Sequence, residues 1–198
     1  MSTWHDERQR KFRRWLGWIC LLTLIDQASK GIVRTTLLPG SRLPIVDNIL
    51  FITFIPNYHG FSWFVPDLPD WFQPIFLVLR LIILAMAFPV YDFYSQSEQA
   101  GRWAWIALIT ISAGVTGNLL DDIFMTYTTD FIQAFQSPSA NLADLFSYAG
   151  IGALAVEFGV QWKKKKSRWH GFQHYLAHVV QVRRDFSVFL KRYFTRKQ

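Results

Sequence analysis

The chain has 198 residues, of which 51% are hydrophobic and 17% aromatic. This composition is too apolar for an ordinary soluble domain and is typical of a protein that crosses a bilayer. The net charge of +7 is concentrated in residues 163–198, which contain eleven Lys and Arg residues and one acidic residue, Asp185. A basic segment after apolar spans indicates anionic lipid headgroups as a partner and argues against nucleic acid. The single cysteine, Cys20, excludes an intrachain disulfide and a cysteine metal cluster.

Four apolar stretches are long enough to cross a bilayer, which takes about 20 residues per helix. They cover approximately residues 15–38, 71–94, 103–124 and 141–161. The first resembles a signal peptide because basic residues precede it, but it continues without a cleavage pattern and therefore predicts a retained span. Lys and Arg residues gather before the first stretch and after the fourth, whereas the first and third loops contain few. The positive-inside rule thus predicts cytoplasmic termini and outward-facing first and third loops.

The first outer loop and the tail have patterns of their own. β-branched, aliphatic and aromatic residues at 49–55 predict a strand, and a second strand at 61–65 would complete a small sheet. Such a sheet could hold a peptide by strand addition. In the tail, apolar residues recur every three or four positions from Phe172 to Tyr193, with basic residues beside them. This pattern predicts an amphipathic helix on the cytoplasmic leaflet, with docking on a partner's helix or a disordered charge run as alternatives.

The predicted fold class is an all-α membrane protein. It has four transmembrane helices, a small extracytoplasmic β-element and a cytoplasmic amphipathic C-terminal helix. We expect a membrane domain over residues 1–162 and a basic amphipathic tail over residues 163–198.

Two aspartates, Asp130 and Asp144, fall on the predicted outer side, before and at the start of the fourth apolar stretch. Ionisable residues at membrane depth are costly and usually serve function. Two carboxylates brought together can share a proton and activate water, as in aspartic proteases. The alternative is structural, since Asp144 would suit the first turn of a helix and Asn141 would suit its N-cap.

Three of the other charged residues inside the predicted spans are informative. Asp26 and Lys30 are four residues apart on one helix face, so they can pair and offset the cost of burying each other, which is sufficient for a purely structural role. Arg80 lies about halfway along the second span and needs a partner. We expect it either to pair with Asp26 or to extend outward toward the two aspartates.

The chain resembles the lipoprotein signal peptidase (signal peptidase II) family, which removes signal peptides from lipidated prolipoproteins. The resemblance covers roughly residues 15–162 and rests on several short motifs in the expected order. These are Asp26-Gln27 with Lys30, Gly117-Asn118 with Asp121, Asp130-Phe131, and Asn141 with Ala143-Asp144.

The resemblance implies roles for these residues. It makes Asp130 and Asp144 the catalytic pair of a metal-independent and cofactor-independent aspartyl endopeptidase. The implied supporting or substrate-binding residues are Asp26, Lys30, Asn57, Gly60, Asn118, Asp121 and Asn141. Asn118 and Asn141 would orient the pair, and Asn57 and Gly60 would contact substrate, although His59 lengthens their spacing and Tyr58 is the alternative to Asn57. The implied substrate is a lipidated prolipoprotein or another membrane-anchored peptide, cleaved on the outer face of the bacterial cytoplasmic (inner) membrane.

Three positions depart from the family pattern. Asp122 stands where the family has an arginine, and this places a negative charge near the carboxylate pair that would raise its pKa values. The segment between Asp130 and Asp144 is short, and Ala140 replaces a phenylalanine. These departures favour a second hypothesis, a non-catalytic subunit that binds lipidated or transmembrane peptides or a membrane protein partner. A third hypothesis is an ion or proton pathway that uses Asp26, Lys30 and Arg80, but the sequence shows neither the internal repeats nor the broken-helix signals typical of transporters.

Overall fold

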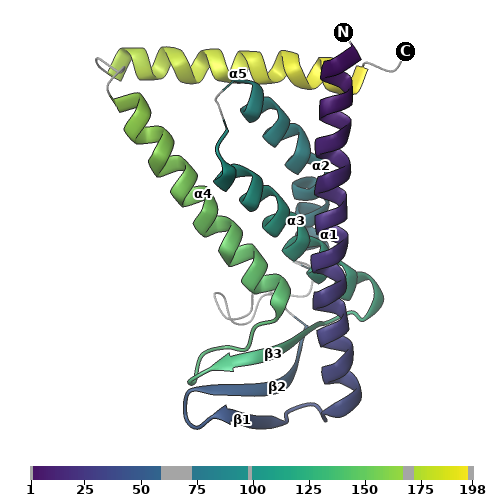
Figure 1. Ribbon diagram of the computed structural model, residues 1–198. Helices are drawn as coiled ribbons and strands as arrows, with labels where there is room; N and C mark the ends of the chain where they lie inside the picture. The colour runs from purple at the N-terminus through teal and green to yellow at the C-terminus, as the bar shows by residue number, and fades with distance from the viewer. Residues whose placement is uncertain (1, 59–72, 98–99, 167–171, 196–198) are drawn as a thin grey trace.

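The computed structural model describes residues 2–58, 73–97, 100–166 and 172–195 (Figure 1). Its helices are α1 (Ser2–Thr36), α2 (Gln73–Ser97), α3 (Arg102–Phe124), α4 (Leu142–Lys166) and α5 (Phe172–Thr195). Its strands are β1 (Arg42–Val46), β2 (Leu50–Asn57) and β3 (Thr128–Ala134). Within the described residues, α1 to α4 each contain a segment long and apolar enough to cross a membrane. The prediction of a four-span, mostly helical membrane protein with a small β-element is confirmed.

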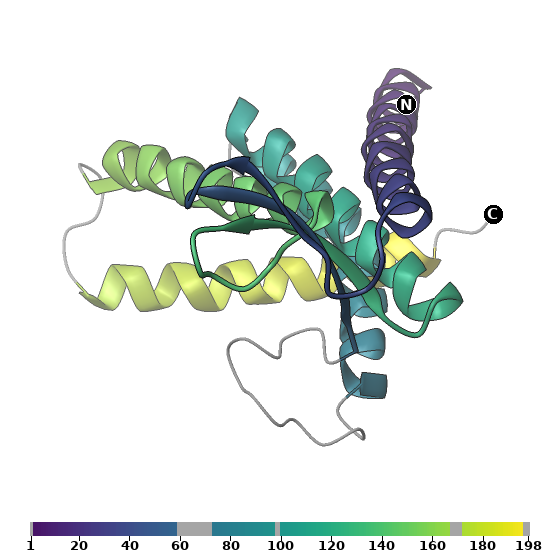
Figure 2. The same cartoon turned by 90° about the horizontal axis from the view of Figure 1, so that it is seen from below.

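The two chain termini and α5 lie at one end of the spanning helices, and the sheet lies at the other (Figure 1). We call these the α5 end and the sheet end. Figure 2, viewed from the sheet end, shows the strands in front of the helix ends. The predicted C-terminal helix is present as α5, which runs crosswise to the spans. α1 begins at Ser2, earlier than the predicted span, because the basic N-terminal segment continues the same helix.

α3 is the central helix, because it packs against α1, α2 and α4. Small side chains allow this close packing, and Ala107 and Ala113 are fully buried. At Gly114 a Cβ atom would overlap the Ser147 hydroxyl and the Ala143 carbonyl oxygen of α4. Two glycines one turn apart, Gly114 and Gly117, therefore let the α3 and α4 backbones approach each other closely.

A buried glutamate on α4 fastens the spans together toward the α5 end. Glu157 Oε1 accepts hydrogen bonds of 2.9 Å from the Tyr94 hydroxyl of α2 and from the Gly101 backbone amide. Gly101 is the N-cap of α3 and supplies no capping side chain. Glu157 thus satisfies an amide at the start of α3 that would otherwise lack a partner.

The sheet is antiparallel with the strand order β1-β2-β3. β2 confirms the strand predicted at residues 49–55. Neither neighbouring strand was predicted, and the second strand expected at 61–65 lies outside the described residues. Phe54 and Phe131 bury one face of the sheet against Val33 of α1, so the sheet is anchored directly on the first span.

The segment between Asp130 and Asp144 is the remainder of β3 and a turn that returns along it. Ile132 and Ala140 exchange two backbone hydrogen bonds of 2.8 Å each. This return brings the chain to the start of α4 within a few residues. The shortness of the segment is thereby explained, since a strand and its return need less chain than a helix.

The close approach of α3 and α4 makes a testable prediction. We expect Gly114→Ala to lower the thermal unfolding temperature in detergent, because overpacking typically costs about 1–3 kcal/mol. Gly152→Ala on α4 is the matched control, since a Cβ atom there would meet nothing within 4 Å. That control should be neutral or slightly stabilising because alanine favours helix. Equal unfolding temperatures for the two variants would contradict the packing.

Candidate active site

Lys30 of α1 is fully buried, and three oxygen atoms hold its ammonium group. Its Nζ lies 2.8 Å from Asp26 Oδ2 and 3.0 Å from Asp121 Oδ2. It also donates a 3.0 Å hydrogen bond to Asn118 Oδ1. Both aspartates are fully buried as well. Since an ammonium group has three protons to donate, these three acceptors satisfy it, and the expected pair between Asp26 and Lys30 is present.

The two buried aspartates also hold the backbone next to the candidate catalytic residues. Asp26 Oδ1 accepts a 2.8 Å hydrogen bond from the backbone amide of Ala143, directly before Asp144. Asp121 Oδ2 accepts a 3.1 Å hydrogen bond from the backbone amide of Thr129, directly before Asp130. The charges buried in α1 and α3 therefore fix the start of α4 and the middle of β3.

Asp130 and Asp144 share one asparagine as a hydrogen-bond donor. The side-chain amide of Asn141 donates to Asp130 Oδ1 at 2.7 Å, and its backbone amide donates to Asp144 Oδ2 at 3.1 Å. Each carboxylate has a second amide donor, Asn57 for Asp130 at 2.9 Å and Asn118 for Asp144 at 2.8 Å. The structure thus brings together both predicted carboxylates and all three predicted asparagines.

Asn141 is also the N-cap of α4, as one reading of the sequence predicted. Its Oδ1 accepts a 3.0 Å hydrogen bond from the backbone amide of Asp144, while the Asp144 carboxylate accepts from the Asn141 backbone amide. This reciprocal pattern is a capping box with aspartate in the place of glutamate. Asn141 therefore caps α4 and also bridges the two carboxylates, so the structural role does not exclude the other one.

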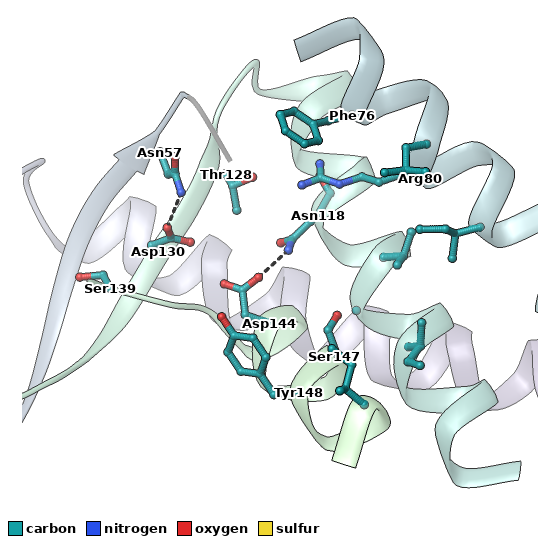
Figure 3. Close-up of a pocket in the computed structure, with 16 residues that line it drawn as sticks. Asn57, Phe76, Arg80, Asn118, Thr128, Asp130, Ser139, Asp144, Ser147 and Tyr148 are labelled. Atoms are coloured by element: carbon teal, nitrogen blue, oxygen red, sulfur yellow. Dashed lines mark hydrogen bonds between the residues drawn. The ribbon is translucent and has the colours of Figure 1, made fainter. Parts of the chain in front are cut away.

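The carboxylates face a cavity of about 330 Å³ between β2, β3, α2, α3 and α4. Figure 3 shows Asp130 projecting from β3 and Asp144 from α4, with Tyr148 beside Asp144. Polar groups line the sheet end of the cavity, and Phe76, Leu79, Ile83 and Ile151 line the part between the spans. The cavity therefore offers a polar centre for chemistry beside an apolar surface at membrane depth.

The pKa of Asp130 is raised to about 7. Burial is the main cause, because only 4% of the residue is exposed, and the charge of Asp144 adds to it. Hydrogen bonds from Asn57 and Asn141 and the charge of Lys30 act in the opposite direction. Asp130 can therefore carry a proton near neutral pH.

Of the two alternatives expected for Arg80 from the sequence, the pair with Asp26 is wrong. Asp26 is taken by Lys30, and the Arg80 guanidinium instead forms an ion pair with Asp122, one helix away on α3. It also donates a 3.4 Å hydrogen bond to the Asn118 carbonyl oxygen and lines the cavity (Figure 3). The negative charge of Asp122 is thus offset, and the causes of the raised pKa of Asp130 are burial and Asp144.

Several residues in or near the cavity were not predicted from the sequence, and one predicted residue is not described. Gly60 lies outside the described residues. Tyr148 and Thr128 line the cavity without any sequence signal, because contacts across elements carry no fixed spacing. Gln27 belongs to the Asp26-Gln27 motif, but the sequence predicted no role for it. Its side chain donates hydrogen bonds to the Gly117 carbonyl oxygen at 2.9 Å and to Asp121 Oδ1 at 3.1 Å.

No group of three His, Cys, Asp or Glu side chains in the described parts of the chain is arranged to hold a metal ion. The polar side chains that line the cavity are two carboxylates, two of the three amides, Arg80, a phenol and the hydroxyls of Thr128, Ser139 and Ser147. Two carboxylates with a shared donor, one of them protonated near neutral pH, are suited to activating water against a carbonyl group.

The fold and the site together define a multi-pass membrane protein with a carboxylate pair at one end of its spans. The family model for signal peptidase (SPase) II matches residues 18–160, and the chain belongs to this family. A bacterial membrane enzyme determined by the in meso method at 2.3 Å resolution has a similar fold, with a TM-score of 0.64 and 20% sequence identity over 79% of this chain and 92% of that one. A second such enzyme, determined at 1.9 Å resolution, gives a TM-score of 0.60 and 20% identity over 72% of this chain and 90% of that one.

The buried Lys30 cluster makes a stability prediction. Lys30→Met leaves Asp26 buried without a counter-charge and leaves Asp121 with only Arg34, at 3.6 Å, and breaking a buried pair typically costs about 3–5 kcal/mol. We expect a large loss of thermal stability in detergent, and partial recovery on adding Asp121→Asn. Arg80→Met is the comparison, because its partner Asp122 is 26% exposed and can be solvated. An unfolding temperature for Lys30→Met at or above that of Arg80→Met would contradict the assignment.

Proposed function

We propose that the chain is an aspartyl endopeptidase that cleaves the signal peptide of lipidated prolipoproteins. The observation that carries this proposal is that Asn141 bridges Asp130 and Asp144 beside a cavity lined by both polar and apolar side chains. Membership in the signal peptidase II family supports the reaction class. The apolar part of the cavity suits a membrane-anchored peptide, whose hydrophobic segment can lie between the spans while its scissile bond reaches the carboxylates.

In the proposed reaction Asp130 holds the proton and Asp144 is ionised. Both carboxylates accept two amide hydrogen bonds, but Asp144 alone lies in the first turn of a helix, where the helix dipole favours negative charge. It takes a proton from water as the water oxygen attacks the scissile carbonyl carbon, and Asp130 protonates the carbonyl oxygen. Asp144 then gives the proton it took from water to the amide nitrogen, and Asp130 takes a proton from a hydroxyl of the diol. The C–N bond breaks, an amine and a carboxylic acid are released, and both aspartates return to their starting states.

The proposed location is the bacterial cytoplasmic membrane, with both termini inside and the sheet end outside. The distribution of Lys and Arg supports this orientation, because the basic N-terminal flank and the basic tail are both at the α5 end. The carboxylate pair would then act on the outer face, where a lipidated prolipoprotein presents its cleavage site. The alternative remains a non-catalytic relative that binds such peptides in the same cavity.

The first test is cleavage of a diacylglyceryl-modified prolipoprotein peptide by the purified protein in detergent. We expect Asp130→Asn and Asp144→Asn each to lower kcat by at least about 100-fold, the usual range for loss of a general acid or base. Asp185→Asn is the matched control, because Asp185 is exposed on α5.

Cleavage that survives either site substitution would contradict the carboxylate pair. Peptide binding without cleavage by the unmodified protein would establish the non-catalytic alternative.

The pKa of Asp130 makes a second prediction. Its proton is held below a pH of about 7 and lost above it, so kcat/KM should fall as pH rises through 7. Asn57→Leu removes a donor that lowers this pKa and should therefore move the alkaline limb to higher pH. Gln133→Leu is the control and should leave the limb in place, because Gln133 lies on β3 with Asp130 but donates its hydrogen bond to the Ser137 carbonyl oxygen. The measurement is the pH–rate profile; a limb that moves to lower pH in Asn57→Leu would overturn the assignment.

A further inference from the structure

α5 docks on the ends of the spans through aromatic side chains. The Phe93 ring of α2 lies 5.0 Å from the Phe186 ring and 5.4 Å from the Phe189 ring, measured between centroids. α5 runs crosswise to the spans at the end where the termini lie (Figure 1). A helix placed in this way lies near the plane of the membrane surface, at the depth of the lipid headgroups.

Arg8 joins three helices at the far end of α5. Its guanidinium carbon lies 3.9 Å from the centroid of the Tyr193 ring of α5, and its Nε lies 3.2 Å from Asp92 Oδ2 of α2. Only 8% of the Asp92 side chain is exposed, so this ion pair is largely buried. The contact holds α5 against α1 and offsets the charge of Arg8.

A cleft of about 490 Å³ lies beside this junction, between α1, α2 and Tyr193. Its polar rim is Arg8, Gln9 and Arg13. Phe12, Leu16 and Phe88 form its apolar wall, and 38% of Phe12 and 41% of Leu16 are exposed.

Polar and apolar groups in this cleft follow each other along the axis of the first span. Arg8 precedes Leu16 by eight residues, which is about 12 Å of helix at 1.5 Å per residue. Arg8 and Gln9 therefore lie toward the aqueous end and Leu16 lies toward the bilayer interior, with Phe12 and Arg13 between them. A phospholipid has the same order, with a phosphate above its acyl chains.

The charge balance around the cleft selects an anionic ligand. Arg13 is exposed and makes no ion pair or hydrogen bond with any described residue. Exposed cations are also present on α5, at Arg183, Arg184, Lys191 and Arg192. Two acids next to the cleft are paired, Glu7 with Lys11 and Asp92 with Arg8, and Asp185 on α5 accepts a hydrogen bond from Gln181. Each cation near a membrane surface contributes about 1 kcal/mol of attraction to anionic lipid.

We propose that this cleft binds one anionic phospholipid of the leaflet at the α5 end. The lipid phosphate lies against Arg13 and the rim, and its acyl chain lies along the exposed side chains of Phe12 and Leu16. The site goes beyond the proposed peptidase function, since both α5 and the rim residues lie outside residues 18–160, which the signal peptidase II family model matches.

The test is lipid binding to the full-length protein in detergent, followed by native mass spectrometry. Short-chain phosphatidylglycerol and phosphatidylcholine are titrated separately, and inorganic phosphate is added as a competitor to distinguish a lipid from a free anion. We expect one phosphatidylglycerol to bind in preference to phosphatidylcholine, without displacement by phosphate. Arg13→Gln should weaken this binding about fivefold, the equivalent of 1 kcal/mol.

Arg14→Gln is the matched control, because Arg14 is the next residue on α1 and is exposed but does not line the cleft. It should change the affinity less than twofold. Equal losses in the two variants would mean diffuse attraction to a basic surface and would overturn the site. Equal binding of the two lipids, displacement by phosphate, or no effect of Arg13→Gln would also overturn it. The readout does not depend on peptidase activity, so failure of either proposal leaves the other standing.

Discussion

A lysine buried between two membrane spans is the constraint on which the site depends. Lys30 cannot stay charged without oxygen partners, and it finds them in Asp26, Asp121 and Asn118. The same two aspartates reach the backbone directly before Asp144 and Asp130. Burial of one cation in the first span thus sets the spacing of α1 and α3 and, through backbone amides, the positions of both candidate catalytic carboxylates.

The spans could be predicted from the sequence because a bilayer demands about 20 apolar residues, and this demand leaves a local pattern. The β2 strand could be predicted for a similar reason, since its residues are β-branched and aromatic. β3 was missed because its sequence, Thr128 to Ala134, mixes polar and apolar residues without a clean alternation. Its pairing with β2 is set by the end of α3, which delivers the chain to the sheet, and no local pattern records this.

The contacts of the site also fall into those that local sequence spacing predicts and those that depend on how distant segments pack. Asp26 and Lys30 are neighbours on one helix, so their spacing alone predicts their pair. Asn141 could be predicted as an N-cap, yet its second contact with Asp130 depends on the return of the chain after β3. Arg80 and Asp122 are 42 residues apart on consecutive helices, and only the packing of α2 on α3 reveals their pairing.

The Arg80 and Asp122 pair changes how the replaced family arginine should be understood. Considered alone, Asp122 adds a negative charge next to a carboxylate pair, where it would disfavour ionisation of both. With Arg80 beside it, the added charge is offset, and a guanidinium lines the cavity from α2 instead of α3. Among the four spans, α2 packs mainly on α3. The charge balance of this cavity therefore depends on the contact between these two helices, which couples the electrostatics of the carboxylate pair to the position of α2.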